Sequence, residues 1–166
     1  MNAATLPEND SRVATLTREL PDFLAGGGTV GALLGYPPEQ LEAAYGYARA
    51  LYEEARYEDA LSLFAFLSFN DHLAPRYHWG LGACAQMLGR HEEAMQAYGM
   101  LVAMDMSDPA PIYRIAECLL ALGRRDEARE TLDVVVALAD EDTAEHRALR
   151  RRAQAMLTLL KGDCAP

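Results

Sequence analysis

Basic residues are scarce in this chain, and their scarcity limits what it can bind. Its 166 residues include 15 Lys and Arg against 25 Asp and Glu, which gives a net charge of -10 and a pI of about 4.8. A molecule with this charge repels a phosphate backbone and an anionic membrane surface. We therefore expect no nucleic acid among its partners. The length and the apolar content of 51% are typical of one domain with one hydrophobic core.

Cysteine pairs and long hydrophobic runs are missing as well. The three cysteines form no C-x-x-C pair, so we expect no disulfide framework and no zinc site, but buried thiols at Cys84 and Cys118 and a free tail thiol at Cys164. The longest uncharged stretch, residues 23–38, contains five glycines, which argues against a membrane-spanning helix. The first ten residues lack the basic start and apolar core of a secretory signal. We expect a cytoplasmic protein that does not insert into membranes.

Catalytic motifs are also absent from the sequence. The four histidines are scattered, and no Ser-His-Asp, H-E-x-x-H or phosphate-loop spacing occurs. The glycine triplet at residues 26–28 is not followed by Lys and Ser or Thr, and acidic pairs such as Glu92 and Glu93 are typical of solvated turns. We therefore expect no enzyme, with no catalytic residue, no metal and no cofactor.

A period of 34 residues organises the middle of the chain. An Arg, a variable residue, two acids and an Ala recur three times in this order, and the alanines stand 34 residues apart at Ala60, Ala94 and Ala128. A second ladder of small residues has the same interval and consists of Ala48, Gly82 and Ala116. Small side chains at both ladders are what two helices need in order to pack closely, and the period resembles that of the tetratricopeptide repeat.

This period predicts an all-α fold, a helix-turn-helix solenoid. Gly89 and Gly123 suit a left-handed C-cap at the end of the first helix of their repeats, where the first repeat has Ala55. Asp142 and Glu145 resemble a capping box that opens a last helix, which covers the open end of the stack. We expect the following segments: a disordered N-terminus at 1–9, an N-terminal helical segment at 10–36, three repeats within 37–142 (41–74, 75–108 and 109–142), a capping helix at 143–161 and a tail at 162–166.

Residues 23–30, Phe-Leu-Ala-Gly-Gly-Gly-Thr-Val, precede the first repeat. We expect the glycines to end a first helix of about residues 10–25 and Thr29 to cap a short second one. Further strings are Tyr-Glu-Asp-Ala at 57–60, Asp-His at 71–72, Gly-Leu-Gly-Ala-Cys at 80–84 and Ala-Glu-Cys-Leu-Leu at 116–120. Together with the repeats, they make residues 16–160 resemble the class II chaperones of type III secretion, the SycD/LcrH group.

This resemblance implies a bacterial cytoplasmic chaperone for two hydrophobic translocator proteins, which keeps them soluble and competent for secretion until export. It also implies that a Pro-x-Leu-x-x-Pro-like segment near the translocator N-terminus binds in the concave face of the repeats. The N-terminal helix mediates homodimers in this family. An apolar stripe interrupted by Pro21 is available for a homodimer of the free protein here: Val13, Leu16, Leu20, Phe23 and Leu24.

Counting along each repeat assigns side chains to this concave groove. Rigid aromatic rings suit the capture of an extended apolar peptide, although some of them can instead pack between helices. Arg49 departs from the family pattern, since relatives often have an apolar residue there. The groove residues that we expect are Tyr45, Arg49, Tyr52, Arg76, Trp79, Ala83, Gln86, Tyr113, Glu117 and Leu120.

Two other functions fit a tetratricopeptide repeat. A generic adaptor or co-chaperone would grip a C-terminal carboxylate with a clamp of Lys and Asn, but at the clamp positions this chain offers only the two arginines Arg49 and Arg114. A regulatory partner of a transcription activator is the other alternative, and the sequence does not test it.

Overall fold

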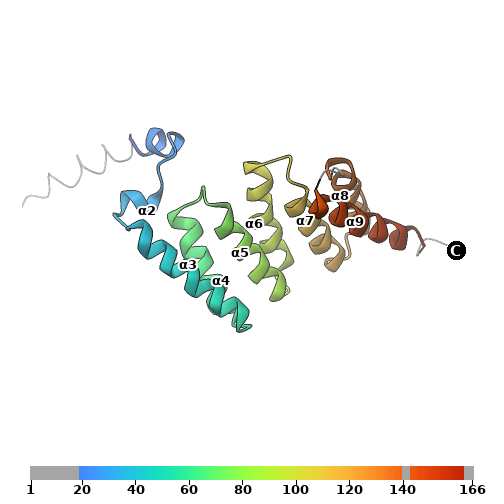
Figure 1. Cartoon of the computed structure of the whole chain (residues 1–166), viewed down its shortest axis with the longest axis horizontal. Coiled ribbons are helices and arrows are strands. Elements are labelled where there is room, and N and C mark those ends of the chain that lie inside the picture. Colours follow the sequence, from blue (N-terminus) through green and yellow to red (C-terminus); the bar gives the residue numbers. More distant parts are fainter. Residues whose placement is uncertain (1–18, 140–142, 163–166) are drawn as a thin grey trace, which may run out of the picture.

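The computed structural model describes residues 19–139 and 143–162, and within these ranges it is all-helical, as predicted. A short helix, α2 (Val30–Leu33), is followed by three helix pairs and a last helix, arranged in chain order along the long axis of the molecule (Figure 1). Successive helices of the pairs pack against each other, and α9 packs on α8. The bounds are α3 (Pro38–Glu53), α4 (Tyr57–Asn70), α5 (Pro75–Met87), α6 (His91–Met104), α7 (Pro109–Ala121), α8 (Arg125–Leu138) and α9 (Ala144–Gly162).

Proline and capping side chains define the helix starts. Helices α3, α5 and α7 each have a proline in the first turn, where its missing N–H costs nothing. The carboxylate of Asp108 accepts a hydrogen bond from the Ala110 N–H at 2.8 Å, and the Thr29 hydroxyl accepts one from the Ala32 N–H at 3.2 Å. The predicted Thr29 cap is therefore confirmed, and Asp108 caps α7 in the same way.

A threonine caps the start of α9 within the described residues. The Thr143 hydroxyl accepts a hydrogen bond from the His146 N–H at 3.0 Å, and the helix begins at Ala144. Asp142, the predicted capping residue, lies outside the described residues. Threonine is among the residues preferred at an N-cap, because its hydroxyl accepts from an N–H of the first turn.

The first helix of every pair ends in the same left-handed turn. Ala55, Gly89 and Gly123 have φ of 59°, 72° and 74°, so alanine adopts here the conformation that the two glycines favour. The residue after each of them donates its N–H to a carbonyl five residues back, which satisfies a helix end. These bonds join Arg56 to Leu51 at 2.9 Å, Arg90 to Ala85 at 2.8 Å and Arg124 to Leu119 at 2.9 Å.

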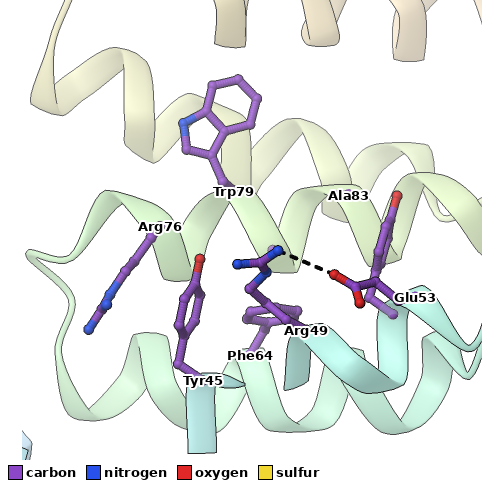
Figure 2. A pocket seen from close by; sticks show the side chains of 9 residues that line it. Tyr45, Arg49, Glu53, Phe64, Arg76, Trp79 and Ala83 are labelled. Atoms are coloured by element: carbon purple, nitrogen blue, oxygen red, sulfur yellow. Dashed lines mark hydrogen bonds and ion pairs between the residues drawn. The ribbon is translucent and has the colours of Figure 1, made fainter. Parts of the chain in front are cut away.

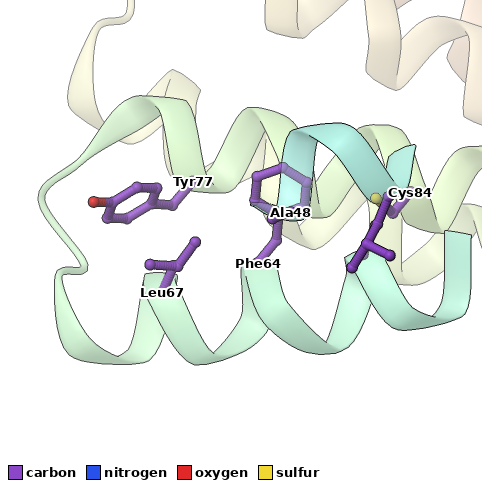
Figure 3. Packing of buried hydrophobic residues seen from close by; sticks show 7 residues of the cluster. Ala48, Phe64, Leu67, Tyr77 and Cys84 are labelled. Carbon is purple, nitrogen blue, oxygen red and sulfur yellow. The ribbon is translucent and has the colours of Figure 1, made fainter. Parts of the chain in front are cut away.

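Packing at the helix crossings explains the two ladders of small residues. Ala48, Ala60, Ala94, Ala116 and Ala128 are all fully buried. At Gly82, an added Cβ would lie 2.6 Å from the Tyr98 ring, closer than atoms can approach. The core between the first two pairs contains Phe64, Leu67, Tyr77 and Cys84 beside Ala48 (Figure 3).

The glycine triplet ends the first helix, as predicted. Residues 19–25 are helical, Gly27 is left-handed with φ of 87°, and the Gly28 N–H donates to the Phe23 carbonyl at 2.8 Å. Gly28 has a second reason to be glycine, because an added Cβ would lie 2.3 Å from the Phe23 ring. Pro21 lies within the helical stretch. The predicted disordered segment 1–9 and the earlier part of the predicted helix lie outside the described residues.

Helix α9 covers the end of the stack with an apolar face. Ala153 and Leu157 of α9 are buried there. They pack in one apolar cluster with residues of the third repeat that include Ile112, Leu132 and Val135. The Arg150 guanidinium donates a hydrogen bond to the Ala139 carbonyl at 3.0 Å, which ties α9 to the end of α8. Within the described parts of the chain, none of the helices combines the length and apolar character that crossing a membrane requires.

Candidate functional site

A cavity of about 480 Å³ opens between α3 and α5, and Phe64 of α4 also lines it (Figure 2). This volume is in the range of about 300–1,000 Å³ that is typical of ligand sites. The structure brings six of the ten predicted groove residues to this cavity. They are Tyr45, Arg49, Tyr52, Arg76, Trp79 and Ala83.

The aromatic walls of the cavity are braced by neighbouring rings. Tyr45 lies 5.6 Å from Tyr77 between ring centroids, and Trp79 meets the buried Tyr98 at 5.5 Å in an edge-to-face arrangement. Tyr52 contacts Tyr57 in the same way at 5.3 Å. Rings held in this manner lose little further freedom when a ligand contacts them, so they are suitable anchoring surfaces.

Three residues of the cavity wall are absent from the predicted list, namely Glu53, Phe64 and Gly80. Phe64 is buried, and its ring reaches the cavity beside Gly80. A Cβ at Gly80 would lie 2.3 Å from that ring, so only glycine leaves room for it. The signal in the sequence was the pair of glycines at 80 and 82, of which only the second was recognised as a contact point.

Arg76 is a fixed part of the wall. Its guanidinium pairs with the Glu42 carboxylate at 2.6 Å and donates to the Tyr77 hydroxyl at 3.1 Å. It also lies over the Tyr45 ring at 4.6 Å and over the Tyr77 ring at 5.0 Å. The hydrogen bond with Glu42 raises the pKa of Arg76. These partners hold the charge in one place and leave it neutralised.

Gln86 and Glu117 lie outside the cavity and join α5, α6 and α7 through a polar network. The Tyr98 hydroxyl donates to the Gln86 amide oxygen at 3.0 Å, and the Gln86 amide donates to the Glu117 carboxylate at 3.3 Å. Arg114 donates to the same carboxylate at 2.9 Å. Burial raises the pKa of the Tyr98 hydroxyl, which therefore stays protonated and able to donate.

Tyr113 and Leu120 also lie apart from the cavity. Tyr113 is only 7% exposed, and its ring packs in the cluster that α9 covers. This packing matches the alternative noted from the sequence, in which a ring packs between helices. Leu120 is half-buried on α7. Of the predicted dimer stripe, Phe23 is 40% exposed and Leu20 and Leu24 are half-buried, whereas Val13 and Leu16 lie outside the described residues.

The fold and the cavity define a class, the tetratricopeptide-repeat proteins, and comparisons with known proteins agree. Two family models described as "Tetratricopeptide repeat" match residues 48–109 and 85–153. Low calcium response locus protein H of Yersinia pestis is 40% identical over 70 residues, which are 42% of each chain. Chaperone protein SicA of Salmonella typhimurium is 29% identical over 79 residues, 48% of this chain and 46% of SicA. The matched segments thus span less than half the length of these curated relatives.

Solved structures cover much more of the molecule. The Yersinia enterocolitica type III secretion translocator chaperone SycD superposes with a TM-score of 0.71 at 34% identity, over 80% of this chain and 98% of SycD. PcrH from Pseudomonas aeruginosa gives 0.68 at 37% identity, over 75% and 94%. A type III secretion complex from Aeromonas hydrophila gives 0.79 at 32% identity, over 88% and 97%. The chain belongs to the type III secretion translocator chaperones.

Proposed function

We propose that this protein is a bacterial cytoplasmic chaperone that binds the hydrophobic translocator proteins of a type III secretion system before export. It keeps them soluble by holding an extended segment of the Pro-x-Leu-x-x-Pro type in the groove, and its role is binding without catalysis. The observation that carries this proposal is the cavity between α3 and α5, lined by Tyr45, Tyr52 and Trp79, in a chain of this family. Relatives support it, since PcrH is described with the chaperone-binding regions of PopD and PopB, and SycD with a peptide of YopD.

The small number of apolar anchors limits the affinity of a short peptide. Three apolar anchors at about 1.5–3 kcal/mol each contribute roughly 5–9 kcal/mol before ordering and association costs are subtracted. A micromolar dissociation constant is the expected result for a peptide alone. A whole translocator therefore needs further contacts in order to be held firmly.

Co-expression tests the proposed function directly. We expect a translocator encoded near this gene to be soluble and to co-purify with the chaperone, and to aggregate when it is expressed alone. A translocator that stays insoluble in the presence of the folded chaperone would contradict the proposal.

A pair of variants tests the groove itself. We expect Tyr45→Ala with Tyr52→Ala to weaken peptide binding by tenfold or more, on the order of 1.4 kcal/mol or above, because two braced anchoring surfaces are lost. Tyr47→Ala is the matched control, since Tyr47 lies on the same helix, is 58% exposed and does not line the cavity. Calorimetry measures the affinities, and circular dichroism checks that each variant folds. Unchanged binding in the double variant would refute the groove assignment.

We also propose that the free protein forms a homodimer through its N-terminal helix. Phe23 supports this, because its ring is partly exposed at the surface although it packs over Gly28. A SycD structure described as an alternative dimer shows that a relative self-associates. Sedimentation of Leu20→Glu with Leu24→Glu is the test, and the variant is expected to be monomeric.

A further inference from the structure

Arg49 is the one cation of the cavity wall whose partner is weakly held. Its guanidinium meets the Glu53 carboxylate through a single contact of 3.2 Å, and the two side chains are 59% and 67% exposed. The pair has the cation on the N-terminal side, which is the less favourable order at this spacing on a helix. Exposed pairs of this kind contribute little to stability. The bond can therefore be exchanged for another at little cost.

The surroundings of Arg49 favour a bound carboxylate. Figure 2 shows its guanidinium between the Tyr45 ring and Glu53, within the cavity. Arg76 is neutralised by Glu42, and Glu53 is the single acid of the lining, so Arg49 is the cation of this wall that can change its partner. A peptide in the cavity would displace water from around the guanidinium, and a charge-assisted bond to it would then be stronger than the bond to Glu53 in water.

We propose that Arg49 forms a carboxylate-binding subsite, so that this chaperone selects a cargo segment with an Asp or Glu beside its apolar anchors. The inference rests on the proposed function, because it requires a peptide in the cavity. When the peptide binds, the Arg49 guanidinium leaves Glu53 and donates two hydrogen bonds to the peptide carboxylate. Arg76 keeps its ion pair with Glu42 and its hydrogen bond to Tyr77, and it remains part of the cavity wall.

Matched peptides test this subsite. The probes are synthetic Pro-x-Leu-x-x-Pro peptides that have Glu at one variable position at a time. Calorimetry compares the affinity of each with that of the peptide that has Gln at the same position. At one position we expect Glu to bind about five- to twentyfold more tightly than Gln, and we expect salt to reduce the ratio. In Arg49→Gln the ratio should fall to one or below, since the remaining charge of the protein repels an acid. Arg129→Gln removes the same charge from a position outside the cavity and should keep the ratio.

A second pair of variants tests the exchange of partners. Glu53→Gln removes the competing carboxylate and should strengthen binding of the preferred Glu peptide by about twofold. Glu54→Gln removes a negative charge from the neighbouring residue, which does not line the cavity. This variant should strengthen binding of the Glu peptide less than Glu53→Gln does.

The outcomes separate this inference from the function on which it rests. If Gln peptides bind and no Glu position gains affinity, or if the gain persists in Arg49→Gln, the subsite is refuted while the groove stands. If neither peptide binds and the translocator is not held, the proposed function fails and the subsite fails with it.

Discussion

Ala55 occupies the left-handed position at the end of α3, where the other two repeats have glycine. A Cβ in this conformation costs about 1–2 kcal/mol. We expect Ala55→Gly to raise the free energy of unfolding by about 0.5–1 kcal/mol, because glycine gains some entropy in the unfolded chain and offsets part of the relief. Urea unfolding measures the change. Ala43→Gly, at an exposed position inside α3, is the control and should lower stability by about 1 kcal/mol. A loss of stability in both variants would show that Ala55 is unstrained.

We expect two buried thiols to lower the stability of the folded protein at alkaline pH. Cys84 and Cys118 are fully buried, and burial raises the pKa of each from 9.0 to about 11. A thiol with a raised pKa in the folded state contributes its full stability below the unfolded value and loses it as the pH rises through the folded value. We expect the urea midpoint to fall between pH 9 and 11. The fall should be smaller in Cys84→Ala with Cys118→Ala, and an equal fall in both proteins would assign it to other groups.

At the scale of elements, the crossing of α5 and α6 depends on Gly82. A methyl group there would overlap the Tyr98 ring, whose hydroxyl also belongs to the polar network with Gln86. We expect Gly82→Ala to lower the free energy of unfolding by about 1–3 kcal/mol. Gly99 in α6 is the matched control, since an added Cβ meets no atom within 4 Å. Gly99→Ala should therefore stabilise the protein by roughly 0.5–1 kcal/mol through helix propensity. Thermal unfolding of the two variants should shift in opposite directions.

The helices and most of their ends could be predicted from the sequence because they depend on local spacing. The small residues at the crossings and the left-handed caps repeat with the period, and each has a backbone reason. The direction of Tyr113 could not be predicted in this way. It depends on how α9 packs against the third repeat, and α9 lies outside the period. Phe64 and Gly80 were missed for a similar reason, since their contact joins two different helix pairs.

The groove as a whole has two unlike halves. The aromatic cavity lies between the first two helix pairs, whereas Gln86, Glu117 and Arg114 form a hydrogen-bonded network between the second and third. Under the proposed function, we expect the apolar anchors of a cargo segment and the carboxylate bound by Arg49 in the first half, and further polar groups of the segment against the second. This division could not be predicted from positions alone, because it arises from which side chains reach one another.

At the scale of the whole molecule, α9 packs on the apolar cluster of the third repeat and shields it from water. Leu157 is 8% exposed in the cluster that α9 closes, while Leu159 on the same helix is 71% exposed. We expect Leu157→Ala to cost about 2–5 kcal/mol and Leu159→Ala to stay within about 0.5 kcal/mol of the parent. Chemical unfolding measures both. Equal effects would mean that α9 does not close the stack through this face.

Trp79 has a practical consequence for the study of cargo loading. It is the only tryptophan in the sequence, and it lies in the wall of the cavity. Indole emission shifts with the amount of water around the ring, so a segment that enters the cavity changes the spectrum at this one position. We therefore expect the intrinsic fluorescence of the unlabelled protein to report the filling and emptying of the proposed groove, so that loading and release of a translocator segment can be followed in real time.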